Sequence, residues 1–398
     1  MTTPLRSRDG LFASRLELDR PGEISAFIGD AGRGDVIAFT GGFPDPVTFD
    51  LPLLAELTGT VLADPAAVQY GPTAGMPGLR DWLRGWIGVN DGAPLADAEL
   101  MITSGGMEGL TLLNRCLVEP GDRVLVEAPT FMGALAALRH AEARVTAVPM
   151  DDEGLHTGRL AELLAEGERY QYLYLISDYQ NPTGRSLSAS RRRELVELAR
   201  QYGLLIVEDV AYRELGFDGE RLPSLAALAP ELTVQLGTFA KTFMPGLRLG
   251  WLSGPAELVA AASQAKQYTD QCASPFGQRL LEEFGRCGGF DKSLAVKRDF
   301  YRQRRDAMLT ALADQLPSTV GYTRPAGGFF TWLTLPDTPV AHELAGRAAA
   351  AGVAVLSGRS FYPDGRGGNE LRLSFSKVSP EQITEGIGRL AGLIREIG

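Results

Sequence analysis

Lys241 has unusual surroundings in the sequence, because the residues next to it are small or apolar. The next charged residue after it is Arg248, and Gly237 and Ala240 leave room for a bulky group near the backbone. Two interpretations are open. A single lysine commonly lays its stem on apolar surface and keeps its amine in water. In an apolar, cationic site, however, the amine has a lowered pKa, attacks a carbonyl carbon and forms a Schiff base.

A second group of residues is suited to binding an anion. Ser104, Gly105 and Gly106 open a predicted helix, where backbone N–H groups and the helix dipole attract a phosphate. A turn of small residues is also an ordinary helix start, so this turn alone is weak evidence. Thr238 and Arg248 would add a hydroxyl and a guanidinium to the same anion.

A third group is suited to an electron-poor ring. Asp209 follows the apolar run 204–207, so its carboxylate is poorly solvated unless a cation such as a protonated ring nitrogen pairs with it. The alternative is a carboxylate that only caps the next turn. Tyr212 and Asn181 would supply a phenol and an amide to a ring oxygen, although Asn-Pro-Thr-Gly is also a common turn sequence. Together these groups predict a site for a phosphorylated ring.

A repeated pattern of strand, turn and helix brings these distant residues together. The sequence predicts strands at 100–103, 124–126, 172–176, 204–207 and 233–236, and helices at 106–117 and 191–202. This alternation is typical of a doubly wound α/β fold with a mostly parallel sheet. The carboxyl ends of the parallel strands share one edge, where such folds bind ligands.

The pattern changes near residue 290. One long, arginine-rich helix is predicted over 292–316, and we interpret it as a solvated helix that bridges two domains. Short strands follow, and then a last helix that starts with a capping box. We expect an N-terminal arm (1–45) that packs on the small domain, a large domain (46–288) and a smaller C-terminal α/β domain (289–398).

Composition argues against several classes of protein. The formal net charge of −10 over 398 residues does not suit a nucleic-acid surface. The three cysteines are widely spaced and only three histidines accompany them, so neither a disulfide framework nor a zinc site is predicted. There is no signal-like N-terminus and no apolar run of about 20 residues. We expect a cytoplasmic protein that does not enter a membrane.

Three segments carry a family resemblance. They are Ser-Asp-Tyr-Gln-Asn-Pro-Thr-Gly (177–184), Glu-Asp-Val-Ala-Tyr-Arg-Glu-Leu (208–215) and Gly-Thr-Phe-Ala-Lys-Thr-Phe-Met-Pro-Gly-Leu-Arg-Leu-Gly-Trp (237–251). They resemble the class I/II aminotransferases of PLP fold type I. The likeness runs in register from Gly-Gly-Phe-Pro (41–44) to 371–375, and this opening is similar to the aminoadipate/kynurenine branch. The resemblance implies a large domain with a mostly parallel, doubly wound sheet of the seven-stranded type and a smaller C-terminal α/β domain.

The resemblance also implies roles around the ring of pyridoxal 5'-phosphate (PLP). Lys241 would hold PLP as a Schiff base and move the reacting proton. Asp209 would keep the pyridine nitrogen protonated, and Asn181 and Tyr212 would bond the phenolic oxygen. Phe131 would stack on the ring. Three departures from the family pattern, Ser177, Val210-Ala211 and Ala240, remove none of these groups.

Further residues would bind the phosphate and the substrate. The resemblance assigns the phosphate to Ser104, Gly105, Gly106, Thr238, Arg248 and, from a neighbouring subunit, Tyr70. Tyr70 lies in a glycine-flanked turn between two predicted amphipathic helices, so its tip should be exposed. The protein is thus expected to be a homodimer with shared active sites.

The substrate contacts implied by the resemblance include Arg372, which would bind the α-carboxylate, with Asn181 and Gly42 beside it. Relatives that act on aminoadipate carry an N-terminal arginine for the distal acid. Counted back without gaps from Gly41, that position is Ser25, which argues against an acidic side chain in the substrate. Arg20 and Arg33 are close enough in sequence to keep an acidic substrate open.

The predicted function is transfer of an amino group from an α-amino acid to a 2-oxo acid by a ping-pong mechanism. A PLP enzyme of specialised metabolism that performs elimination, cyclisation or oxidation is the nearest alternative, and product analysis would distinguish the two. A PLP-sensing transcriptional regulator is a more distant one. Gly41 lies too near the start for a winged helix to precede it, and the negative charge does not suit DNA.

Overall fold

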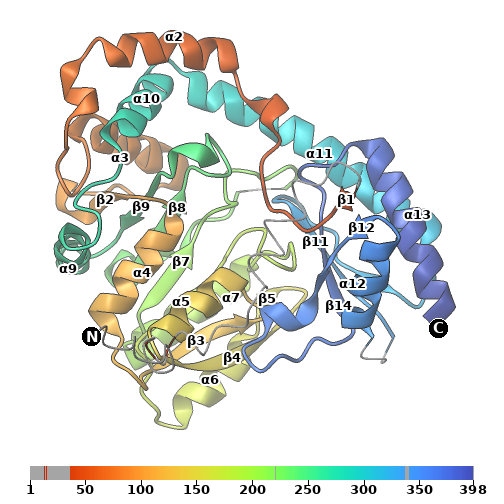
Figure 1. The fold of residues 1–398 in the computed structure, drawn as a ribbon. Coiled ribbons are helices and arrows are strands. Elements are labelled where there is room, and N and C mark those ends of the chain that lie inside the picture. Colours follow the sequence, from red (N-terminus) through yellow and green to blue (C-terminus); the bar gives the residue numbers. More distant parts are fainter. Residues whose placement is uncertain (1–12, 14, 16–35, 220, 337–339, 398) are drawn as a thin grey trace, which may run out of the picture.

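The computed structural model describes residues 13, 15, 36–219, 221–336 and 340–397. Its largest element is a sheet of eight strands in the order β2-β9-β8-β7-β6-β3-β4-β5 (Figure 1). These strands are β2 (Leu100–Thr103), β3 (Arg123–Ala128), β4 (Arg144–Asp151), β5 (Gly154–Leu155), β6 (Leu173–Leu175), β7 (Ile206–Asp209), β8 (Thr233–Thr238) and β9 (Gly250–Ser253). Adjacent strands in the run β8-β7-β6-β3-β4 are parallel. Strand β9 is antiparallel to both β2 and β8, and β5 is antiparallel to β4. The mostly parallel sheet is as predicted, and the short strand β5 makes it eight-stranded.

Alternation along the strands directs side chains into two separate cores. On β3, Val124 and Val126 join one apolar cluster, whereas Leu125 joins another. The first cluster includes side chains of α4 (Gly106–Leu117), α5 (Met132–His140) and α9 (Ala256–Gln267). The second includes those of α6 (Thr157–Ala165), α7 (Ala189–Tyr202) and α8 (Leu225–Leu228). Helices therefore cover both faces of the sheet, which is the doubly wound arrangement.

Three further helices pack at the β2 edge of the sheet. They are α2 (Leu51–Leu62), α3 (Pro77–Asp91) and α10 (Pro275–Arg286), which meet in a third apolar cluster (Figure 1). Asp50 begins α2, because its Oδ1 accepts a hydrogen bond from the Leu53 N–H at 3.1 Å. The turn between α2 and α3 carries Tyr70.

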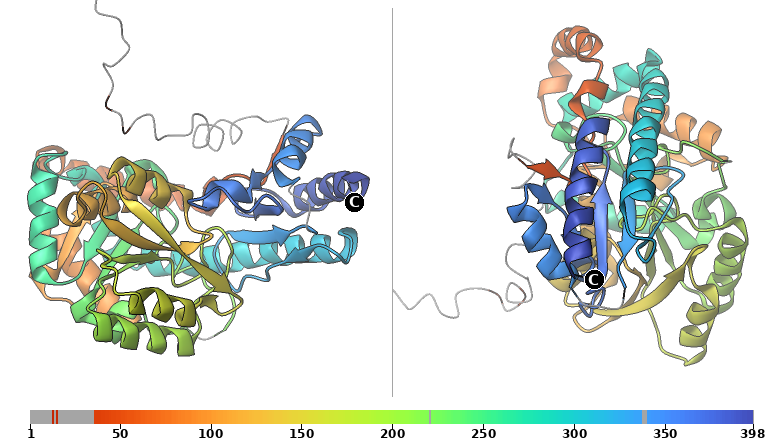
Figure 2. Two further views of the ribbon diagram at one scale, coloured as in Figure 1. Left: turned by 90° about the horizontal axis from the view of Figure 1, so that it is seen from below. Right: turned by 90° about the vertical axis from the view of Figure 1, so that its right-hand side faces the viewer.

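The C-terminal strands and helices form a smaller α/β unit beside the large sheet (Figure 2). It contains a four-stranded antiparallel sheet in the order β10-β11-β14-β13. Its strands are β10 (Gly321–Tyr322), β11 (Phe330–Thr334), β13 (Leu356–Ser357) and β14 (Glu370–Ser374), and its helices are α12 (Ala341–Ala350) and α13 (Pro380–Ile397). The predicted capping box starts α13, since Ser379 N donates to Gln382 Oε1 at 2.9 Å and Gln382 N donates to Ser379 Oγ at 3.2 Å.

The long helix α11 (Gly289–Gln315) joins the apolar clusters of both parts. Its interpretation as a solvated helix was incomplete, because three of its cations are buried: Lys297, Arg304 and Arg305. Arg304 pairs with Asp45 at 2.7 Å and donates to Ser376 O at 2.7 Å. Burial is tolerated because carboxylate and carbonyl oxygens replace water around these cations.

Most of the N-terminal arm lies outside the described residues. In the part that is described, β1 (Ile37–Ala38) pairs in parallel with β12 (Val353–Ala354), and Phe39 is buried against the C-terminal part. The boundaries at 45/46 and 288/289 stay a prediction. Within the described ranges no helix has the length and apolar character needed to cross a membrane, and the cytoplasmic location also stays a prediction.

Candidate active site

The carboxyl ends of the parallel strands surround a cavity of about 180 Å³. Asp209 ends β7, Thr238 ends β8, and Lys241 follows three residues later. Gly106 opens α4, three residues after the last residue of β2. The cavity is lined by these predicted residues: Gly42, Gly106, Phe131, Asn181, Asp209, Tyr212, Thr238, Lys241 and Arg248. The fold thus brings together groups that are as far apart in sequence as Gly42 and Arg248.

Lys241 extends its amine into this cavity. Its Nζ donates a hydrogen bond to the Gly42 carbonyl oxygen at 2.8 Å. Burial, followed by the charges of Arg248 and Arg372, lowers the pKa of Lys241 to about 8, and the carboxylate of Asp209 opposes this shift. An amine with such a pKa is about one-tenth unprotonated at pH 7, far more than an ordinary lysine, and the unprotonated form is the nucleophile.

Asp209 is held in place by neutral donors. The Tyr174 hydroxyl donates to its Oδ2 at 2.8 Å, and the Ala211 N–H donates to its Oδ1 at 3.1 Å. Burial raises the pKa of Asp209 although these hydrogen bonds lower it. A cation that entered the cavity beside this carboxylate would therefore be bound favourably. The sequence did not predict this role of Tyr174. The signal that could have indicated it is a tyrosine in the apolar run of a strand that neighbours β7.

Arg372 lies next to the cavity, on β14. Its Nη1 donates to Asn181 Oδ1 at 2.9 Å, and its Nη2 donates to the Thr40 carbonyl oxygen. The guanidinium also lies over the rings of Phe330, at 4.3 Å, and Phe361, at 5.0 Å. Burial lowers the pKa of Arg372 to about 9. A carboxylate at this position would favour the charged guanidinium.

The glycine turn before α4 meets Arg248 closely. Gly105 has a φ of +101°, and a Cβ placed on it would lie 2.8 Å from Arg248 Nη2. Only glycine therefore lets the guanidinium approach the turn without strain. Nearby, Thr238 Oγ1 accepts a hydrogen bond from the Ala240 N–H at 3.2 Å.

Ser104 has a different placement from its neighbours in the turn. It is not among the residues that line the cavity. Its Oγ donates to Asp270 Oδ2 at 2.5 Å, and its N–H donates to Glu108 Oε2 at 2.6 Å. In this structure Gly105 therefore lies against Arg248 and Gly106 lines the cavity, while carboxylates bind Ser104.

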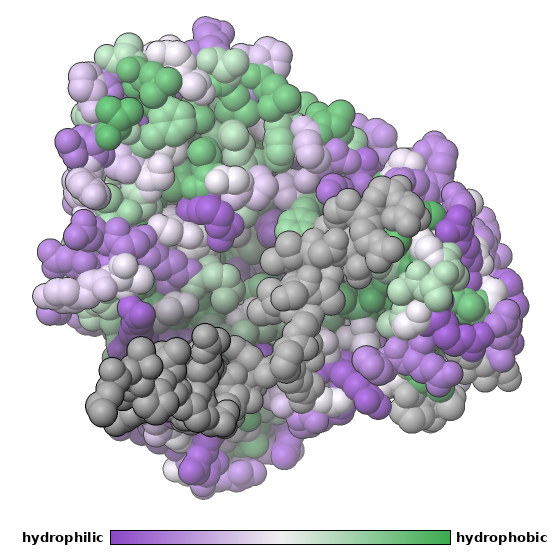
Figure 3. Space-filling view, viewed as in Figure 1, coloured by the Kyte–Doolittle hydropathy of each residue, from purple (hydrophilic) through white to green (hydrophobic). Residues whose placement is uncertain are grey.

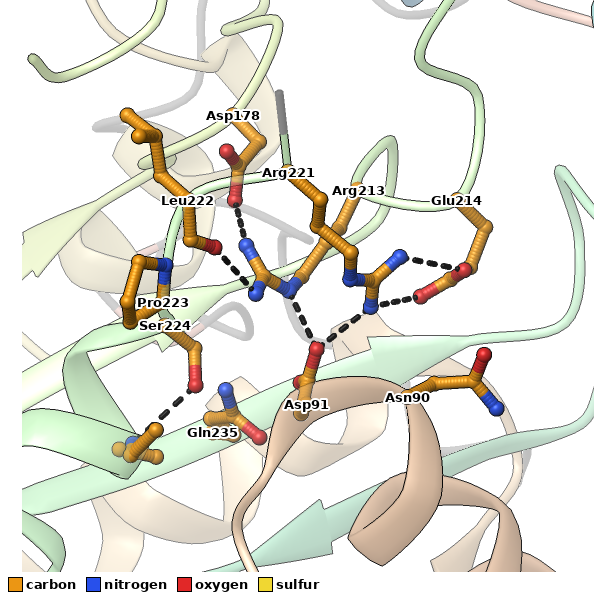
Figure 4. A network of polar contacts seen from close by, with 12 residues as sticks. Asn90, Asp91, Asp178, Arg213, Glu214, Arg221, Leu222, Pro223, Ser224 and Gln235 are labelled. Carbon is orange, nitrogen blue, oxygen red and sulfur yellow. Dashed lines mark hydrogen bonds and ion pairs between the residues drawn. The ribbon is translucent and has the colours of Figure 1, made fainter.

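An ionic network joins residues that neighbour Asn181 and Tyr212 in sequence, and Figure 4 shows the part of it around Arg213. Asp178, three residues before Asn181, accepts hydrogen bonds from Arg192 and from Arg213, both at 2.6 Å. Arg213, the residue after Tyr212, also pairs with Asp91 at 2.7 Å. Burial raises the pKa of Asp178, but the two arginines outweigh it and hold that pKa below the usual value. The network links the segments that carry Asn181 and Tyr212.

Tyr70 is not among the residues that line the cavity. Tyr70 is 80% exposed at the tip of its turn, as the prediction of an exposed tip requires. Ser25, with Arg20 and Arg33, falls outside the described residues.

Comparisons with known proteins identify the family of the chain. The sequence model of the family described as aminotransferase class I and II matches residues 46–390. Aromatic-amino-acid aminotransferase 1 of Thermococcus litoralis is 38% identical over 381 residues, covering 94% of this chain and 91% of the relative.

Two solved structures extend this likeness over nearly the whole chain. The kynurenine aminotransferase of Pyrococcus horikoshii, in complex with PMP, has a TM-score of 0.94 at 35% identity and covers 98% of each chain. The α-aminoadipate aminotransferase LysN of Thermus thermophilus, complexed with N-(5'-phosphopyridoxyl)-L-leucine, has a TM-score of 0.92 at 35% identity and covers 98% of this chain and 99% of the other.

The chain belongs to the class I and II aminotransferases, and its fold is PLP fold type I. It is a PLP-dependent aminotransferase that acts on amino acids. The residues of the cavity fit this cofactor: an amine, an aromatic ring, a buried carboxylate with neutral donors, and a glycine turn beside an arginine.

Proposed function

We propose that this cavity carries both half-reactions of amino transfer, with Lys241 as the residue that attaches PLP. The observation that supports this is the amine of Lys241, whose pKa is lowered to about 8 and which shares one cavity with Asp209. When bound, PLP supplies an electron sink for the negative charge that develops at the substrate Cα. Lys241 Nζ then serves as the base that removes the Cα proton.

The ring-binding roles follow from the donors and acceptors on the walls. Asp209 would pair with the ring nitrogen and keep it protonated, because its own donors in the described residues are neutral. The Asn181 side chain accepts from Arg372 through Oδ1 and also hydrogen-bonds Tyr212, so its two-hydrogen Nδ2 group and the Tyr212 hydroxyl would together meet the ring oxygen. Phe131 would cover one face of the ring.

The opposite ends of the site would hold two anions. At the turn, the N–H groups of Gly105 and Gly106, with Thr238 and Arg248, would bind the phosphate. On the other side, Arg372 would bind the substrate α-carboxylate, and Gly42 would lie beside it. Gly42 must stay small, since a Cβ there would lie 2.6 Å from Phe330 Cζ.

The donor side chain is proposed to be apolar or aromatic. The support is the wall around the cavity, which includes, apart from Phe131, the apolar side chains Phe43, Met107 and Phe330. An aromatic-amino-acid aminotransferase is among the relatives, although an α-aminoadipate enzyme is similar too. Ser25, the position that bears on an acidic side chain, lies outside the described residues.

A screen of amino donors tests both the function and the donor class. Each amino acid is mixed with the PLP-loaded protein without an oxo acid, and the loss of the cofactor's absorbance is followed. We expect rapid bleaching by phenylalanine and leucine, slower bleaching by 2-aminoadipate, and release of the matching 2-oxo acid. Ammonia as the product would contradict amino transfer, whereas fastest bleaching by 2-aminoadipate would contradict only the donor class.

We also propose a homodimer with shared active sites. Apolar side chains gather over the α2 and α10 end of the molecule (Figure 3). On α2 and in the segment that follows it, Leu51, Leu62, Val68 and Tyr70 are exposed. A large exposed apolar patch marks a contact surface. In a two-fold dimer this patch would cover itself, and Tyr70 would reach the phosphate end of the partner's cavity.

A further inference from the structure

Lys266, on α9, is a fully buried lysine at the outer side of the glycine turn. Its Nζ donates to Glu108 Oε2 at 2.7 Å and to both oxygens of Asp270, at 2.7 and 2.8 Å. A lysine has three donors, and carboxylate oxygens engage this amine in three contacts. Lys266 is therefore not a second candidate for attaching a cofactor.

The two carboxylates hold the residue that precedes the glycines. Glu108 accepts from the Ser104 N–H at 2.6 Å, and Asp270 accepts from the Ser104 hydroxyl at 2.5 Å. A further hydrogen bond, from Arg115 Nη1 to Thr269 Oγ1 at 2.6 Å, joins the segment that carries Asp270 to α4. The turn is thus held from the side away from the cavity, and Lys266 lies at the centre of this cluster.

The charges of this cluster bear directly on anion binding. Glu108 lies in the first turn of α4, at the helix end that attracts anions. Together with Asp270 it places two carboxylates beside a turn that would receive a phosphate. Carboxylates there repel a phosphate. The ammonium of Lys266 offsets part of this negative charge, because it contacts both carboxylates.

We propose that Lys266 is a positioning residue for the cofactor phosphate. By binding Glu108 and Asp270 it keeps Ser104 turned outward, so that Gly105 and Gly106 remain available to the anion, and it limits the negative charge beside them. The inference rests on the proposed phosphate site at this turn. The alternative is a buried ion pair that only stabilises the fold.

Comparing PLP with pyridoxal, which lacks the phosphate, separates these two roles. Dissociation constants of both are measured by absorbance on the full-length protein freed of cofactor. In Lys266→Met we expect the affinity for PLP to fall about tenfold to hundredfold, as for a lost hydrogen bond to a charged group. The affinity for pyridoxal should change by less than about twofold. Equal losses for both compounds, or no loss, would overturn the inference.

Two further variants sharpen the comparison. The double variant Lys266→Met/Asp270→Asn has the same formal cluster charge as the wild type, so it should regain much of the preference for PLP. If Lys266→Met does not fold, Asp270→Asn alone carries the test. It removes a negative charge beside the anion and should raise the preference for PLP, whereas an unchanged preference contradicts the inference.

Controls distinguish this inference from the proposed function. Lys292→Met removes an exposed lysine and should leave both affinities unchanged. Arg248→Met should lower the preference for PLP if the turn binds the phosphate. Should Arg248→Met have no effect, the phosphate site itself is misplaced. Should only Lys266→Met have no effect, the positioning role alone is wrong.

Discussion

At the scale of single residues, Lys241 combines burial with two neighbouring cations, and its amine is easier to deprotonate than an exposed lysine. Attack on the PLP carbonyl needs the unprotonated amine. Because the pKa of Lys241 is about 8, the rate of PLP attachment to the cofactor-free protein should rise about tenfold per pH unit below pH 8 and level off above it. Stopped-flow absorbance measures this rate. A plateau reached only above pH 10 would contradict the lowered pKa.

Tyr174 supports Asp209 from behind, and its removal should weaken the pairing of Asp209 with the ring nitrogen. Its hydrogen bond lowers the pKa of Asp209, so Tyr174→Phe should raise that pKa. We expect roughly a tenfold fall in the rate of the first half-reaction, which corresponds to about one pKa unit. A pH titration of the bound cofactor's absorbance should shift as well.

Tyr172→Phe is the matched control for this prediction. Tyr172 is equally buried and lies two residues away, but its hydroxyl donates to Asn114 instead of Asp209. It should affect stability without shifting the cofactor titration. Equal kinetic effects of the two substitutions would mean that Tyr174 acts only through packing.

At the scale of elements, the ionic network behind Asn181 and Tyr212 joins segments that follow different strands. The side chain of Arg213 is 2% exposed and bonds both Asp178 and Asp91, so Arg213→Met takes one of two arginine partners from each of these buried carboxylates. Removing one partner of a buried ion pair lowers the free energy of unfolding by about 3–5 kcal/mol. Arg221 pairs with the same Asp91, but the Arg221 side chain is 31% exposed. Arg221→Met should therefore lower the free energy of unfolding by only about 0–1 kcal/mol. Denaturant unfolding of the cofactor-free protein measures both.

Equal losses for the two arginines would contradict the account of this network. A small loss for Arg213→Met would have the same meaning, because it would show that water or other groups solvate Asp178 and Asp91.

The sequence was sufficient for features that depend on local patterns. The strand β2 lies at the predicted residues 100–103, and the turns after the strands place Asp209, Asn181 and Lys241 at one edge. Side-chain partners were not predictable in the same way. Tyr174 meets Asp209 across 35 positions and Lys266 meets Glu108 across 158, so no local pattern encodes either contact.

The buried cations show a second limit of sequence reasoning. Arginines on α11 suggested a solvated face, but Arg304 and Arg305 are buried by the packing of α11 against segments distant in sequence. Charge alone indicates exposure, and only the tertiary fold supplies the oxygens that permit burial.

At the scale of the whole molecule, the proposed dimer makes Tyr70 part of the partner's active site. Tyr70→Phe should loosen PLP and leave the dimer intact, because the exposed hydroxyl adds little to the apolar contact surface. Mixing Tyr70→Phe with Lys241→Ala subunits tests the sharing. If sites are shared, each heterodimer has one site with both wild-type groups and one with neither. The cofactor should then bind at the single intact site with wild-type affinity.

The opposite result of that mixing experiment is equally clear. If Tyr70 serves its own subunit, the only site with Lys241 also carries Tyr70→Phe. Heterodimers would then show only the loose affinity, and the shared-site proposal would be wrong.

The attachment of PLP to Lys241 is the central claim, and borohydride reduction followed by peptide mapping tests it most directly. Reduction fixes the cofactor to the amine that carries it, and mass spectrometry then locates the modified lysine. The account predicts one modified site, Lys241, in the wild type and none in Lys241→Ala. A reduced cofactor on Lys266 or Lys292, or on no lysine at all, would contradict it.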